Sequence, residues 1–117
     1  MLLVDDDELV QSSIGAILES LGYGVSLASN AEEALARLQA GLRPDVAILD
    51  INMPGMGGGK AMPHLRALLP SLPILLSTGR ADQAVLDLVE SFPRTALLPK
   101  PFSKIELQEH LNAILSA

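Results

Sequence analysis

The sequence predicts a single α/β domain in which five parallel strands form one sheet and helices cover both of its faces. Five short apolar segments alternate with five helical stripes, and most of the apolar segments run into a charged or hydroxyl side chain. The chain of 117 residues, 49% hydrophobic, suffices for one domain with one sizeable core. Because crossovers of this length join parallel strands by right-handed connections, the five strands should share one sheet.

The N-terminal part of the chain predicts the first strand, the first helix and the second strand. Residues 1–4 are apolar and stop at an acidic run, as a buried strand does at the edge of a sheet. From Val10 to Leu21 the apolar side chains recur at helical spacing, and Gly22 supplies the left-handed residue that commonly follows a helix. Residues 23–28 alternate weakly and are predicted to form the second strand.

A second helix and a buried strand follow. Asn30 with Glu33 three residues later is a variant of the capping box, which predicts a helix start, and Gly41 closes the helical stripe. The apolar segment 45–50 has the length of a strand buried on both faces, and it ends in Asp50 directly before a Pro-Gly turn. Asp50 should therefore lie at the carboxyl edge of the sheet, where open α/β sheets hold their ligands.

The middle of the chain predicts the third helix and the fourth strand. An apolar stripe between residues 62 and 69 marks the helix, and Pro63 lies in its first turn or bends it. The glycine run 57–59 has neither the spacing nor the Lys-Ser/Thr pair of a phosphate-binding loop, so we expect it to form a flexible loop. Residues 73–78 are predicted to form the fourth strand, which ends in hydroxyl side chains.

The last part of the chain predicts two helices with a strand between them. Asp82 should cap the fourth helix. Residues 95–99 form the predicted fifth strand, and Lys100 follows it directly. Ser103 and Glu106 have the spacing of a full capping box, which places the start of the fifth helix.

The polar residues at the strand ends should form one group in this topology. Asp5 and Asp6 follow the first strand, Asp50 ends the third, Thr78 ends the fourth and Lys100 follows the fifth. Because parallel strands end at the same edge of a sheet, these residues should meet there. Polar residues placed at random would fall at both edges, so their common position indicates a site more strongly than any one motif.

Three carboxylates at one edge require positive charge. At a separation of about 5 Å and an effective dielectric constant near 20, each pair repels by roughly 3 kcal/mol. Lys100 supplies one positive charge, and a divalent cation would supply the rest; Mg²⁺ suits one or two carboxylates with waters and a phosphate, whereas Ca²⁺ takes more ligands. With the cation present, Thr78 could hydrogen-bond an incoming phosphoryl group and Asp50 could act as its nucleophile.

Four sequence motifs occur in order, namely Val4 to Asp7, Asp50 to Met56, Ser77 to Gly79, and Lys100 to Phe102. With these motifs the chain resembles the receiver domain of two-component response regulators along nearly its whole length. The resemblance implies a single receiver domain over residues 1–117. It also implies a flavodoxin-like doubly wound (βα)5 fold with strand order 2-1-3-4-5.

The resemblance further implies a signalling function. The chain would accept a phosphoryl group on Asp50 from the phosphohistidine of a sensor histidine kinase or phosphotransfer domain, and a downstream output domain or protein would respond. It would be no dedicated enzyme, although it would catalyse its own phosphoryl transfer and autodephosphorylation. The implied site consists of Asp5, Asp6, Asp50 and the backbone carbonyl of Asn52 around Mg²⁺, with Thr78 and Lys100 on the aspartyl phosphate.

Two positions bear on how such a switch transmits its signal. Leu97 stands three residues before Lys100, where many receivers carry a Tyr or Phe whose rotation reports phosphorylation. We therefore expect weaker or rerouted transmission. The Lys100–Pro101 bond is cis in the family, and we expect the same isomer here. The expected partner surface is the last helix, the last strand and the helix that Asp82 caps.

Composition argues against several other classes of protein. A net charge of -6 and a pI near 4.7 argue against direct nucleic-acid binding, which needs a basic face. The absence of cysteine excludes disulfides, thiolate zinc sites and thiol nucleophiles. The sequence has no signal-peptide pattern and no apolar run of about 18 residues, so we expect a cytoplasmic protein without membrane contact. A weak homodimer is also compatible with the sequence.

Two other functions stay open on the sequence alone. Leu97 is compatible with a degenerate receiver that acts as a phosphorylation-independent interaction module, which would bind metal without taking up phosphate. A small hydrolase with Asp50 as nucleophile would turn over phosphate esters steadily. The sequence shows neither a second acid nor a substrate-enclosing cap for that reaction.

Overall fold

Strands and helices alternate along the chain in the computed structural model, which describes residues 1–51, 57–80 and 82–116. The strands are β1 (Leu2–Val4), β2 (Ser26–Ala28), β3 (Ala47–Asp50), β4 (Ile74–Thr78) and β5 (Thr95–Pro99). The helices are α1 (Glu8–Ser20), α2 (Ala31–Gln39), α3 (Gly57–Leu68), α4 (Gln83–Ser91) and α5 (Lys104–Leu115).

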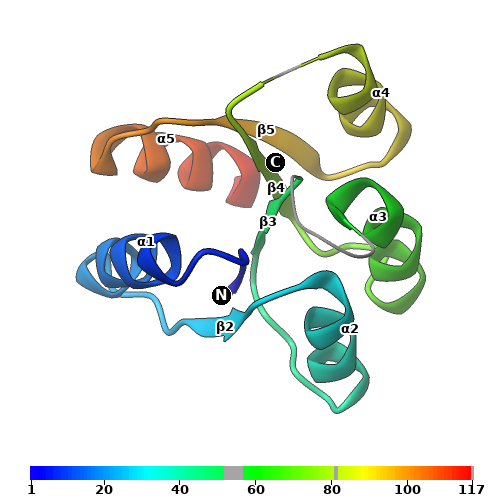
Figure 1. Ribbon diagram of the computed structural model, residues 1–117, viewed down its shortest axis with the longest axis horizontal. Helices are drawn as coiled ribbons and strands as arrows, with labels where there is room; N and C mark the ends of the chain where they lie inside the picture. Colours follow the sequence, from blue (N-terminus) through cyan, green and yellow to red (C-terminus); the bar gives the residue numbers. More distant parts are fainter. Residues whose placement is uncertain (52–56, 81, 117) are drawn as a thin grey trace.

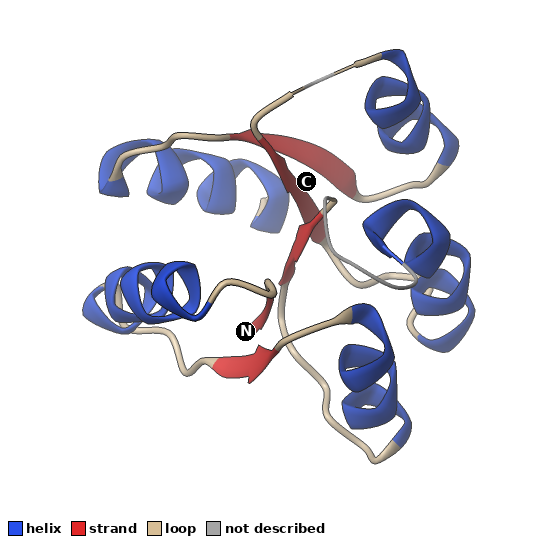
Figure 2. Ribbon diagram, in the orientation of Figure 1, coloured by secondary structure: helices blue, strands red, loops and turns tan. Residues whose placement is uncertain are grey.

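The described strands form one parallel sheet in the order β2-β1-β3-β4-β5, which confirms the predicted topology. Helices α1 and α5 cover one face of this sheet, and α2, α3 and α4 cover the other (Figure 1). The sheet passes between these two helical layers in the manner of a doubly wound fold (Figure 2). None of the described helices is long and apolar enough to cross a membrane.

Each face of the sheet has its own hydrophobic core, because successive side chains of a strand point to opposite faces. Leu3, Ile48, Leu75 and Leu98 pack with α1 and α5. The residues packed with α2, α3 and α4 are Leu2, Val4, Ala47, Leu49, Ile74 and Leu76. The central strands are therefore apolar on both faces, which is why they appear in the sequence as continuous apolar runs.

The predicted helix caps are present. Asp82 and Ser103 cap α4 and α5, and Ser103 forms a reciprocal capping box with Glu106. Asn30 caps α2 by accepting from the Glu33 N–H at 2.7 Å. The Glu33 carboxylate accepts a hydrogen bond from the Ser29 N–H, one residue before the cap.

Two sequence predictions were wrong in their boundaries. The second strand begins at Ser26, because this edge strand pairs only with β1 and β1 offers just three residues. The glycine run 57–59, expected as a loop, forms the first turn of α3, so Pro63 lies inside the helix and not in its first turn. The burial of Met62 and Leu65 against the core outweighs the low helix propensity of glycine.

Candidate functional site

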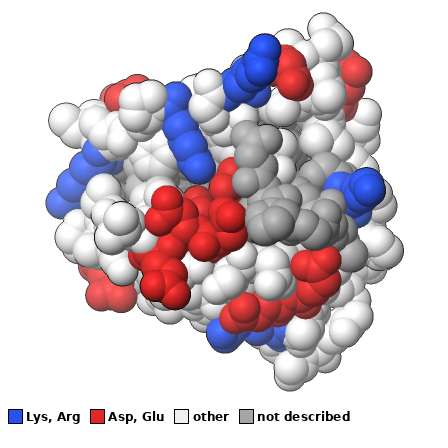
Figure 3. Space-filling view, in the orientation of Figure 1, with Lys and Arg blue, Asp and Glu red and all other residues white. Residues whose placement is uncertain are grey.

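The candidate site lies at the carboxyl edge of the sheet, where β1 and β3 end side by side. Asp5 directly follows β1 and Asp50 is the last residue of β3, so the Val4–Leu49 pairing brings them together. Asp5 comes two residues after Leu3 and Asp50 two residues after Ile48, and both of these apolar residues pack with α1 and α5. Because side chains two residues apart in a strand point to the same face, both carboxylates lie on the α1/α5 side of the sheet edge. Figure 3 shows acidic side chains gathered near the middle of this end of the molecule.

Three carboxylates form the centre of the site. Asp5 and Asp50 are 3% and 6% exposed, whereas Asp6 is exposed. One oxygen from each of the three residues lies within 4.8 Å of the other two. A donor set made only of carboxylate oxygens suits a hard cation such as Mg²⁺, so the residues present fit the ion that the sequence predicts.

Lys100 supplies the positive charge. Its Nζ lies 3.5 Å from Asp5 Oδ2 and 3.6 Å from Asp50 Oδ1, so one ammonium bridges the two buried carboxylates. The Lys100 N–H donates to the Thr78 carbonyl at 2.8 Å and extends the β4–β5 pairing by one residue. The Lys100–Pro101 bond is cis, as expected.

The environment of Asp5 changes the pKa of its carboxyl group. Burial raises the pKa of Asp5, and the charge of Asp50 raises it further. The Asp7 N–H, which donates to Asp5 Oδ1 at 2.9 Å, and the Lys100 ammonium both lower it, but burial dominates. The Lys100 ammonium therefore does not offset the effect of burial on the pKa of Asp5.

Thr78 has a hydrogen-bonding arrangement that the sequence did not reveal. Its side chain is buried, and its hydroxyl donates to the Arg80 carbonyl at 3.1 Å and accepts from the Arg80 N–H at 3.0 Å. These bonds close a small turn after β4. To donate to a phosphoryl group on Asp50, the hydroxyl would have to turn its proton away from the Arg80 carbonyl.

The structure thus brings Asp5, Asp6, Asp50 and Lys100 together, and it places Thr78 at the end of the neighbouring strand. Asn52, predicted as a backbone ligand, lies outside the described residues. Sequence reasoning missed Gln11, whose side-chain amide contacts the backbone of Asp5. Nothing in the local sequence signals that contact, because it depends on how α1 packs against the ends of β1 and β2.

The chain matches the sequence model of the response regulator receiver domain over residues 1–112. It is 39% identical over 117 residues to the response regulator MprA of Mycolicibacterium vanbaalenii, covering 98% of this chain and 49% of that protein. The chain thus spans about half the length of the curated relatives it matches.

Solved structures show the same similarity. Chemotaxis protein CheY4 of Vibrio cholerae superposes with a TM-score of 0.89 at 31% identity, covering 97% of this chain and 95% of that one. The receiver domain of sensor histidine kinase PA1611 from Pseudomonas aeruginosa superposes with a TM-score of 0.87 at 30% identity, covering 99% and 96%. That structure has a magnesium ion coordinated in its active-site cleft.

Proposed function

The chain belongs to the response regulator receiver domain family of two-component signalling, and on this premise we propose that Asp50 is its phosphoacceptor. The observation that carries the proposal is the position of Asp50 at a strand end, with its Oδ1 3.6 Å from Lys100 Nζ and beside the Asp5 and Asp6 carboxylates. A buried carboxylate held next to a cation and a metal-binding set is arranged for phosphoryl transfer.

In the proposed reaction, a carboxylate oxygen of Asp50 attacks the phosphorus of a phosphohistidine. The new O–P bond forms as the P–N bond breaks, and the imidazole nitrogen keeps the bonding electrons and takes up a proton. Lys100 is within reach of the incoming oxygens and offsets their negative charge. Water later attacks the phosphorus, which releases inorganic phosphate and restores the Asp50 carboxylate.

Asp5, Asp6 and Asp50 are the residues proposed to hold Mg²⁺, with the Asn52 carbonyl as a further ligand. When bound, the ion neutralises the oxygens of the phosphoryl group during its transfer. Without it, burial and the charge of Asp50 favour proton uptake by Asp5, and the Lys100 ammonium between the two carboxylates opposes it.

The proposed switch acts through the turn after β4. A phosphoryl group on Asp50 adds charge and acceptor oxygens at the edge of the sheet. The Thr78 hydroxyl would exchange its bonds to Arg80 for a bond to that group, which would release the segment leading into α4. Leu97 has no aromatic ring that could rotate in response to this movement. We therefore propose that the phosphorylation signal is transmitted through the connection between β4 and α4.

The proposed partners are a histidine kinase or phosphotransfer domain, which donates the phosphoryl group, and an output domain or protein that responds to it. The family is a signalling family, and we propose that any catalysis by this chain is limited to its own phosphorylation and dephosphorylation. We retain the expectations of a cytoplasmic location and of no direct nucleic-acid contact as part of this proposal.

The test is phosphate uptake measured by intact mass after incubation with Mg²⁺ and acetyl phosphate. We expect the parent protein to gain one phosphoryl group and Asp50→Asn to gain none. Asp45→Asn is the matched control, because Asp45 is an exposed acid before β3, at the opposite edge of the sheet. Equal uptake by Asp50→Asn and the parent would refute the assignment, and metal binding without uptake would favour a degenerate receiver.

A further inference from the structure

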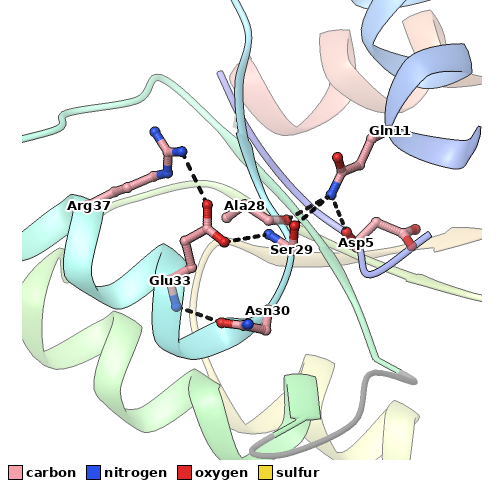
Figure 4. Close-up of polar contacts among 7 residues, drawn as sticks. All are labelled: Asp5, Gln11, Ala28, Ser29, Asn30, Glu33 and Arg37. Atoms are coloured by element: carbon pink, nitrogen blue, oxygen red, sulfur yellow. Dashed lines mark hydrogen bonds and ion pairs between the residues drawn. The ribbon is translucent and has the colours of Figure 1, made fainter. Parts of the chain in front are cut away.

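The side chain of Gln11 connects helix α1 to the loop that carries Asp5 and Asp6. Its Nε2 donates to the Asp5 carbonyl at 2.5 Å and lies 3.4 Å from both the Ala28 carbonyl and Ser29 Oγ. Figure 4 shows the amide placed between the ends of β1 and β2, pointing toward these acceptors. One side chain therefore contacts the two strand ends next to the carboxylate cluster.

The acceptors around Gln11 fix the orientation of its amide. Backbone carbonyl oxygens can only accept, so the NH₂ group and not the amide oxygen must face Asp5 and Ala28. The last residue pair between the two strands is Val4 with Ala28, and the Asp5 N–H donates to the Ala28 carbonyl at 3.1 Å. Beyond that pair, Gln11 supplies the donor for the carbonyl of Asp5, the residue after β1, so it extends the bonding past the end of the strand.

Ser29, which lies beside the Gln11 amide after β2, is itself held in place by α2. The Ser29 N–H donates to Glu33 Oε2 at 3.2 Å, and Arg37 forms an ion pair with Glu33 at 3.1 Å (Figure 4). The Ser29 hydrogen bond and then Arg37 lower the pKa of the Glu33 carboxyl, so the group stays charged and keeps this bond at neutral pH. Ser29 thus gives Gln11 a fixed second support on the β2 side.

The backbone of Asp5 matters because Asp5 and Asp6 are consecutive. Asp5 Oδ1 already accepts from the Asp7 N–H, which fixes the carboxylate relative to its own loop. Gln11 fixes that loop relative to the sheet and so relative to Asp50 on β3. Without a cation, the clustered carboxylates repel one another, and this repulsion would push the loop away from Asp50 unless a bond opposed it.

We propose that Gln11 is a positioning residue for the metal site: it holds the Asp5–Asp6 backbone against carboxylate repulsion and so preorganises the ligands. The inference rests on the proposed metal site. Gln11 touches neither the metal nor the phosphoryl group in this scheme and acts only through the Asp5 carbonyl. Hydrogen bonds that orient metal ligands commonly increase the affinity of the site for its metal by a measurable factor.

The test compares Mg²⁺ affinities of the parent and Gln11→Met, measured by NMR titration of the Asp6 amide. Methionine has a similar length and no charge but cannot donate. We expect the dissociation constant of Gln11→Met for Mg²⁺ to be about three- to tenfold larger than that of the parent, as the loss of one such hydrogen bond predicts. Because glutamine and methionine are both neutral, the ratio should be the same at low and high salt.

The control is Gln108→Met on α5, an exposed glutamine that we expect to leave the affinity unchanged. A second measurement needs no variant: in the parent, the Gln11 side-chain amide resonances should shift with the same dissociation constant as the Asp6 amide. Mg²⁺ binding by Gln11→Met equal to the parent, or Gln11 resonances that do not respond, would overturn the inference and leave the proposed function intact. Failure of the parent to bind Mg²⁺ would refute the proposed metal site itself, and the inference with it.

Discussion

Asp5 gives the clearest prediction for a single residue. Because burial raises its pKa in the folded state above the unfolded value, its charge opposes folding once pH rises above the unfolded pKa. This cost in folding free energy reaches its full value above the pKa that Asp5 has in the folded protein. It vanishes at low pH, where Asp5 is protonated in both the folded and the unfolded protein. Asp5→Asn should therefore stabilise the metal-free protein at pH 7 by about 1 kcal/mol, a typical gain when a destabilising functional group is removed.

Urea unfolding of Asp5→Asn and the parent in EDTA measures this difference. The difference should shrink as the pH is lowered toward 4, because the parent regains its proton there. Asp45→Asn removes an exposed acid at the other edge of the sheet and should change the free energy of unfolding little at either pH. An Asp5→Asn protein less stable than the parent at pH 7 would contradict the prediction and show that Lys100 compensates the charge fully.

At the residue scale, the sequence predicted the groups that depend only on where a strand ends. Asp5, Asp50 and Lys100 lie where the apolar runs stop, so topology alone brought them together. The bonding of Gln11 was missed because it depends on which backbone group the side chain reaches after folding. The Thr78 turn was also missed, although its bonds are local. A threonine at a strand exit before glycine does favour a bond to the N–H two residues on, so the Thr78 turn had a local signal.

At the scale of elements, Arg66 of α3 joins segments at the amino edge of β4 and β5, away from the carboxylates. Its guanidinium is buried and donates to the Leu72 carbonyl before β4 and to the Pro93 and Arg94 carbonyls before β5. Burial, and next the charge of Arg94, lowers the pKa of Arg66. The connection after α4 is therefore held to α3, whereas the Thr78–Arg80 bonds form a turn directly after β4.

Arg66→Met should destabilise the protein by about 2 to 4 kcal/mol. It removes the charged donor from the buried Leu72 carbonyl and from the partly buried Pro93 and Arg94 carbonyls, while it preserves the packing of the side-chain stem. Urea unfolding gives this value directly. Arg37→Met is the matched control: its exposed pair with Glu33 on α2 should contribute about 0.5 kcal/mol or less. A similar decrease in the free energy of unfolding for both variants would contradict the structural role of Arg66.

Element boundaries were predicted well where local chemistry fixes them. Asp82 and Ser103 start α4 and α5 as expected because a side-chain cap acts within one turn. The predicted start of α3 and the predicted length of β2 were wrong because local sequence decides neither of them. Packing of the helix on the core draws residues 57–59 into α3, and the three residues of β1 limit β2.

At the scale of the whole molecule, the order of the strands converts distant positions into one site. β1, β3, β4 and β5 are neighbours, so groups from positions 5 to 100 meet at the carboxyl edge. In the proposed reaction, a phosphohistidine carried by a protein would approach this edge over the surrounding surface, whereas a small phosphodonor would reach Asp50 directly. The surface beside the site should therefore affect only the first reaction.

A groove beside Lys100 is the apolar part of that surface, and it is lined by Leu9, Val10, Ser13, Ile14, Lys100, Pro101 and Phe102. Leu9, at 79% exposure, is the most exposed large hydrophobic side chain in the described part of the chain. Ile105 on α5, three residues after Phe102, is 67% exposed. Because both side chains contact little of their own protein, their truncation should cost little stability. We expect a donor protein to bury Leu9 when it docks.

Leu9→Ser should slow phosphoryl transfer from a phosphorylated histidine phosphotransfer domain about tenfold or more, the effect of removing an apolar anchor from an interface. Its uptake from acetyl phosphate should equal that of the parent, because Asp50 and Lys100 are unchanged. Leu68→Ser, at a 38% exposed position on α3, is the control and should leave both reactions unaltered. Equal slowing with both donors would place the defect in the site itself, and no slowing with either would mean that the donor docks elsewhere.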